Sequence, residues 1–98
     1  MTVNKTVEGT KLTLAVEGRV DTNSAPAFLS EFTEASKEAT EVVIDLGAVN
    51  YISSAGLRVL LSMQKVMNKQ GKMTIVNVTP DIMEVFDLTG FTDILNIE

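Results

Sequence analysis

The chain has 98 residues, of which 45% are hydrophobic and 21% charged, a composition typical of one ordinary globular domain. It contains no cysteine and no histidine, which excludes disulfides, thiolate metal sites and the usual general base of a serine hydrolase. The formal net charge of −5 argues against binding to nucleic acid. No signal peptide and no apolar stretch of membrane-spanning length is present, so we expect a cytoplasmic protein without membrane insertion.

The N-terminal part of the chain predicts a hairpin. Residues 2–8 are a weak strand candidate, and residues 11–17 alternate apolar and polar side chains as a half-buried strand does. Gly9 and Thr10 between them favour a tight turn. We therefore predict an antiparallel pair of strands, the second of which ends in the segment Gly18-Arg19-Val20-Asp21.

A helix and a buried strand are expected next. The polar residues Thr22, Asn23 and Ser24 are candidate caps, and Pro26 fits the first turn of a helix. After this helix, residues 42–46 form a continuous apolar run rich in β-branched side chains. Such a run suits a central strand that is covered on at least one face.

The stretch from Asn50 to Arg58 joins this strand to a second helix and carries most of the functional argument. It leads into a strongly apolar helical pattern over residues 57–70. A helix start exposes unpaired N–H groups and a partial positive charge. Ser53 or Ser54 could therefore cap this helix, and a phosphate there would be well tolerated.

The C-terminal part predicts a strand, a helix and a short last strand. The strand covers residues 73–78, the helix begins at Thr79-Pro80-Asp81 and stops at Gly90, and residues 94–97 form the last strand. The resulting order, β-β-α-β-α-β-α-β, indicates an α/β fold. Its mixed sheet has an N-terminal antiparallel hairpin followed by parallel strands joined by right-handed crossovers.

The two serines have three possible roles. The simplest is a helix cap. A catalytic nucleophile is disfavoured because the chain has no histidine and no Gly-x-Ser-x-Gly elbow, and Lys65 lies far along the helix. We therefore expect no enzyme and no catalytic residue. The third role is that of a kinase substrate, since phosphorylation adds about −1.5 to −2 charges and would act on whatever docks there.

Asp21 and Asp45 each lie near the C-terminal end of a predicted strand, where the sites of open α/β sheets collect. For Asp45 we expect a carboxylate that anchors a turn or loop. A phosphoaspartate would need an adjacent acidic pair for Mg²⁺ and a lysine at the end of a late strand, and the sequence has neither. No metal site is expected. Asp21 would lie beside the serines if the two strands are neighbours.

Three segments of the chain match one known family. They read Gly18-Arg19-Val20-Asp21, Asp45-Leu46-x-x-Val49-x-Tyr51-Ile52-Ser53-Ser54-Ala55-Gly56-Leu57 and Phe86-x-x-x-Gly90-Phe91. Together they resemble the STAS domains, in particular the bacterial anti-sigma factor antagonists. The resemblance spans nearly the whole chain. It implies a single STAS domain over residues 1–98, with about three helices flanking the sheet and no catalytic activity.

The resemblance also implies a partner-switching function. Unphosphorylated members of the family bind an anti-sigma factor, which frees a sigma factor. The anti-sigma factor is often also a serine kinase, which phosphorylates the antagonist and ends the interaction. ATP and Mg²⁺ would belong to that kinase, so this chain needs no cofactor, and no small-molecule ligand is expected.

The family pattern assigns roles to individual residues. Alignment on Gly56 places Ser54 at the phosphorylated position and Ser53, the second candidate, where the family usually has Asp. Asp21 corresponds to an acidic residue near the phosphorylation site. The expected partner-binding residues are Asp21, Asn23, Ser53, Ser54, Gly56, Leu57 and Arg58. The usual C-terminal helix of the family has no counterpart in this sequence.

An alternative function remains open. STAS domains also serve in transporter complexes and in larger signalling assemblies. In that case the domain would be a constitutive interaction module without phosphorylation, and Ser54 would only cap the helix.

Overall fold

Four strands and three α-helices build the protein, and the computed structural model describes all residues from 1 to 98. In chain order the elements are β1 (Thr2–Glu8), β2 (Lys11–Val20), α1 (Ala25–Ala35), β3 (Glu41–Ile52), α2 (Ser54–Gln70), β4 (Lys72–Val76), α3 (Pro80–Thr89) and the 3₁₀ turn η1 (Phe91–Asp93). The strands lie in the order β1-β2-β3-β4. β1 is antiparallel to β2 and the other pairs are parallel, which confirms the predicted mixed sheet.

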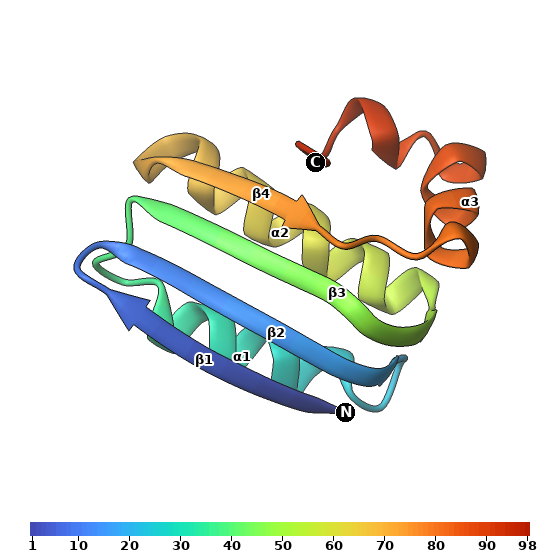
Figure 1. The fold of residues 1–98 in the computed structure, drawn as a ribbon, viewed down its shortest axis with the longest axis horizontal. Coiled ribbons are helices and arrows are strands. Elements are labelled where there is room, and N and C mark those ends of the chain that lie inside the picture. The colour runs from blue at the N-terminus through green and yellow to red at the C-terminus, as the bar shows by residue number, and fades with distance from the viewer.

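One face of the sheet carries the core. Figure 1 shows α1 and α2 side by side behind the sheet, with α3 beyond the end of β4. The alternation in β2 turns Leu12, Leu14 and Val16 toward the two helices, where all three are buried. From α1, Phe28 and Phe32 fill the same layer. None of the helices combines the length and apolar character that a membrane crossing requires.

One strand is longer than the sequence predicts. β2 ends at Val20, within the segment where its end was predicted, but β3 continues from Leu46 to Ile52. The parallel pairing of β2 with β3 has two irregularities, one between Ala15 and Glu17 and one between Gly18 and Arg19. The sequence pattern did not predict the extension of β3, because Gly47 and Ala48 are poor strand formers that interrupt the apolar run. As a result only Ser53 separates β3 from α2, in place of the predicted loop.

The start of α1 differs from the prediction in its capping. Ser24 occupies the N-cap position, but its side chain makes no capping hydrogen bond, because its backbone is already helical. Its hydroxyl instead lies 2.8 Å from the carbonyl oxygen of Arg19. The carboxylate of Asp21 accepts hydrogen bonds from the backbone N–H groups at this helix start.

The last predicted strand, residues 94–97, forms only a single bridge, which pairs Ile97 with Ile75. Gly90 has a φ of +79° and turns the chain into η1, so only the last few residues lie beside β4. β4 itself ends at Val76, two residues earlier than predicted. The next residue, Asn77, has a φ of +57°, which is incompatible with a strand.

Candidate functional site

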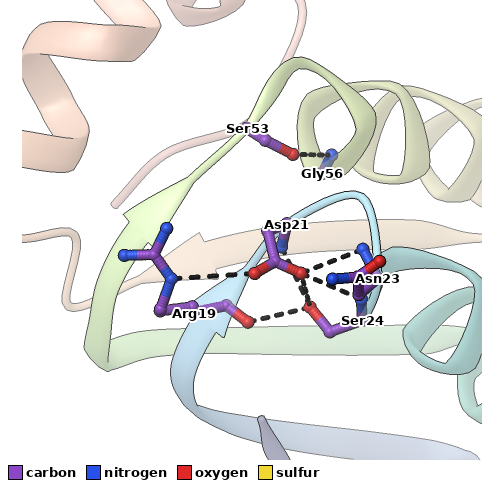
Figure 2. Close-up of polar contacts among 6 residues, drawn as sticks. All are labelled: Arg19, Asp21, Asn23, Ser24, Ser53 and Gly56. Carbon is purple, nitrogen blue, oxygen red and sulfur yellow. Dashed lines mark hydrogen bonds and ion pairs between the residues drawn. The ribbon is translucent and has the colours of Figure 1, made fainter.

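The ends of β2 and β3 bring two distant segments together. In the parallel register Val20 pairs with Ile52, and the backbone N–H of Ser53 donates to the carbonyl of Val20 at 2.8 Å. Because Asp21 follows Val20 directly, it lies beside the β3–α2 junction, as expected for neighbouring strands. Figure 2 shows Asp21 between Arg19 and the start of α1, with Ser53 on the adjacent junction.

Ser53 and Ser54 have different environments. Ser53 has an extended backbone, is partly buried, and its Oγ accepts a hydrogen bond from the N–H of Gly56 at 3.3 Å. It is therefore the N-cap of α2. Ser54 is the first helical residue and is exposed. The cap leaves the Ser54 hydroxyl available to another protein.

Gly56 and Leu57 shape the start of α2 from the inside. A Cβ on Gly56 would lie 2.8 Å from Ile52 Cγ1 and 2.9 Å from the carbonyl oxygen of Val20. Only glycine therefore lets the helix approach the end of β2 this closely. Leu57 is 7% exposed and belongs to the core. Of the four predicted docking residues from Ser54 to Arg58, the exposed side chains are those of Ser54 and Arg58.

Asp21 is held in place by a set of hydrogen bonds. One carboxylate oxygen, Oδ1, accepts from the backbone N–H groups of Asn23 and Ser24, each at 3.0 Å. The Ser24 backbone N–H makes the largest contribution to lowering the pKa of Asp21 below its usual value. The Ser24 hydroxyl, the Asn23 N–H and the Arg19 charge lower this pKa further, while desolvation opposes them. The site therefore holds a fixed negative charge, and the Asn23 side chain beside it is exposed.

The hydroxyl of Ser24 links this carboxylate to β2. It lies 2.8 Å from the carbonyl oxygen of Arg19 and 3.2 Å from Oδ1 of Asp21. A hydroxyl has only one proton to donate, so the Ser24 hydroxyl donates mainly to the nearer acceptor, the carbonyl oxygen of Arg19. Ser24 also accepts from the backbone N–H of Asp21 at 2.9 Å. Hydrogen bonds of Ser24 with Arg19 and with Asp21 thus fix the turn from β2 to α1.

A contact between Arg19 and Tyr51 was not predicted. These residues pair in the register of β2 and β3, and the guanidinium carbon lies 4.2 Å from the centre of the tyrosine ring. Arg19 Nε also lies 3.6 Å from Asp21 Oδ2. The sequence prediction ended β3 at Leu46 and so placed Tyr51 in a loop. The β-forming residues Val49, Tyr51 and Ile52 were the signal that could have extended the strand.

Asp45 has the anchoring role expected of it, within a strand instead of a loop. Its Oδ1 accepts a hydrogen bond from the backbone N–H of Gly47 at 2.8 Å. This bond lies where the pairing of β2 with β3 is irregular. No three acidic side chains lie close enough together to hold a metal ion.

Comparison with known proteins identifies the family. The model of the STAS domain matches residues 2–98. The chain belongs to the STAS domain family. BtrV of Bordetella bronchiseptica, which bears the name of an anti-sigma factor antagonist, is 35% identical over 88 residues, covering 88% of this chain and 76% of BtrV. The anti-sigma-B factor antagonist of Bacillus subtilis is 30% identical over 83 residues, covering 84% of this chain and 76% of that protein.

Solved structures show the same STAS fold. An anti-sigma factor antagonist from Mycobacterium paratuberculosis superposes with a TM-score of 0.88 at 24% identity, covering 98% of this chain and 83% of its own. The antagonist SpoIIAA in its unphosphorylated form gives a TM-score of 0.84 at 13% identity, and the match covers 99% of this chain and 88% of the SpoIIAA chain. The family and fold inferred from the three sequence segments are therefore confirmed. The roles of the individual site residues stay predictions.

Proposed function

We propose that this protein is an anti-sigma factor antagonist and that phosphorylation of Ser54 switches off its binding to the anti-sigma factor. The STAS relatives that are 35% and 30% identical bear the name of such antagonists. We choose Ser54 over Ser53 as the phosphorylated residue because the two serines differ in hydrogen bonding and exposure. Ser53 caps α2 and is partly buried, whereas Ser54 is exposed at the first position of the helix.

The position of Ser54 suits a switch that acts on the surface. A phosphate at the first residue of a helix meets the positive end of the helix dipole and unpaired N–H groups. The fold should therefore tolerate it. The added charge of about −1.5 to −2 would change the surface on which the partner docks.

The docking surface combines exposed and supporting residues. Asn23, Ser54 and Arg58 present exposed side chains, and Asp21 and Ser53 are partly exposed. Gly56 and Leu57 support this surface from below, because both are buried. The partner would be an anti-sigma factor with serine kinase activity in the cytoplasm, and it would bind the ATP and Mg²⁺.

Intact-mass spectrometry tests the switch and its site. The protein is incubated with its anti-sigma factor and Mg-ATP, alongside the variants Ser54→Ala and Ser53→Asn. Asn keeps a capping oxygen but has no hydroxyl to phosphorylate, so this control leaves the helix start intact. We expect one added phosphate on the wild type and on Ser53→Asn, and none on Ser54→Ala. No phosphate on the wild type, from a kinase active on another substrate, would contradict the proposal and favour a constitutive module.

A further inference from the structure

The two arginines of the chain both lie at the candidate site. Arg19 is near the end of β2, and Arg58 is in the second turn of α2. The six lysines all lie outside the two segments that meet here, residues 18–24 and 51–58. In a chain of net charge −5, one guanidinium group thus lies beside Asp21 and the other lies on the helix that begins with Ser54, while the other cations lie elsewhere.

The Arg19 side chain contacts both an aromatic ring and a carboxylate. Its guanidinium stacks over Tyr51 at 4.2 Å and its Nε lies 3.6 Å from Asp21 Oδ2. The side chain is nevertheless 61% exposed, and Tyr51 is 41% exposed. A guanidinium fixed by a ring and a carboxylate loses little conformational freedom when a partner binds it. Arginine and tyrosine are also among the residues that most often dominate the binding energy at protein interfaces.

Arg58 is available for a partner. It is exposed, and none of the ion pairs of the chain includes it. It follows Ser54 by four residues on the same helix, which puts both side chains on one face with their Cβ atoms about 5–6 Å apart. Arg58 therefore lies next to the proposed phosphorylation site.

We propose that Arg19 and Arg58 anchor an acidic surface of the anti-sigma factor, and that Tyr51 holds Arg19 in position for this contact. This inference rests on the proposed function and specifies its partner. An acidic surface is the chemistry that fits, because guanidinium groups bind carboxylates in a fork geometry. The chain as a whole carries a net charge of −5 even with these two cations, so without them it would repel such a surface.

The same arrangement explains how phosphorylation would end the interaction. The two guanidinium groups and the Asp21 carboxylate together carry one net positive charge. A phosphate on Ser54, with a charge of about −1.5 to −2, turns that sum negative. It also offers Arg58 an acceptor on its own helix, in competition with the partner's carboxylates. The phosphorylated protein would thus repel the acidic surface that the unphosphorylated protein attracts.

Binding of the purified anti-sigma factor to unphosphorylated variants tests this inference. We expect Arg19→Gln and Arg58→Gln each to raise Kd at least tenfold and to reduce its salt dependence. Tyr51→Leu should weaken binding several-fold, while Tyr51→Phe, which keeps the ring, should bind like the wild type. The matched controls are Lys11→Gln, at the other end of β2, and Lys65→Gln, further along α2. Both should stay within twofold of the wild type.

Two further measurements separate the possible failures. Thermal unfolding of each variant confirms that the fold is intact. If the wild type binds, and Ser54→Asp abolishes binding, but the arginine variants behave like the lysine controls, this inference is wrong and the proposed function stands. If added salt does not weaken the binding of the wild type, the inference is also wrong and the proposed function stands, because contacts between charged groups weaken with salt. If the wild type does not bind an anti-sigma factor at all, the proposed function fails, and this inference with it.

Discussion

Ser53 and Ser54 are adjacent residues whose side chains lie in different environments. Ser53→Ala removes the oxygen that accepts from the Gly56 N–H, so we expect a loss of about 1 kcal/mol in unfolding free energy. The hydrogen bond is long, at 3.3 Å, and therefore weak, so the loss of unfolding free energy should be no larger than this value. Ser54→Ala should change stability by less than about 0.5 kcal/mol. Urea unfolding measures both, and a larger loss for Ser54→Ala would reverse the assignment of the cap.

Asp21 should make the stability of the protein sensitive to acid. Its pKa is lower in the folded state than its ordinary value of 3.8, so the ionised form stabilises the fold. That contribution is complete above the ordinary pKa and is lost as the pH falls through the lowered one. The Tm difference between wild type and Asp21→Asn should therefore be largest at neutral pH and shrink below about pH 4. Asp87→Asn, at an exposed aspartate of α3, is the control. A difference that does not vary with pH would contradict this role.

At the scale of elements, the site depends on how closely α2 approaches β2. Gly56→Ala places a methyl group against the carbonyl oxygen of Val20, which cannot easily move because it accepts from the Ser53 N–H. Crowding of this kind costs about 1–3 kcal/mol, and the better helix propensity of alanine returns at most about 1 kcal/mol. We expect a net loss of stability in urea unfolding. Ser62→Ala, at an exposed position of α2, should be neutral or slightly stabilising, and an equal response of the two variants would refute the close contact.

The sequence patterns predicted the order and type of the elements better than their ends. Regular alternation identified β2 as a strand, and Pro80 marked the start of α3. The end of β3 was missed because Gly47 and Ala48 break the apolar run, although the β-forming residues Val49, Tyr51 and Ile52 follow them and pair with β2. The last strand was overestimated, since its apolar residues mostly complete the core beside β4.

The same limit applies to the site. Capping chemistry placed the serines at a helix start, and the family resemblance supplied their expected roles. The contact between Arg19 and Tyr51 depends on the register of two strands, which no local pattern encodes. Burial of Leu57, named as a docking residue, likewise depends on how α2 packs against the sheet.

At the scale of the whole molecule, the switch that we propose acts through surface charge and not through refolding. The site lies where β2, β3 and α2 meet, and each of these elements contributes side chains to the one core cluster. Ser54 stands outside that core, at the positive end of a helix. A phosphate there would alter what the surface attracts while the packing beneath it stays unchanged.

The most direct test of this account is calorimetric binding of the anti-sigma factor to two preparations of this protein, one unphosphorylated and one carrying a single phosphate on Ser54. Thermal unfolding of both preparations serves as the control for an intact fold. We expect the unphosphorylated protein to bind and the phosphorylated protein to bind at least a hundredfold more weakly, with similar unfolding midpoints. Equal affinity of the two preparations would contradict the account.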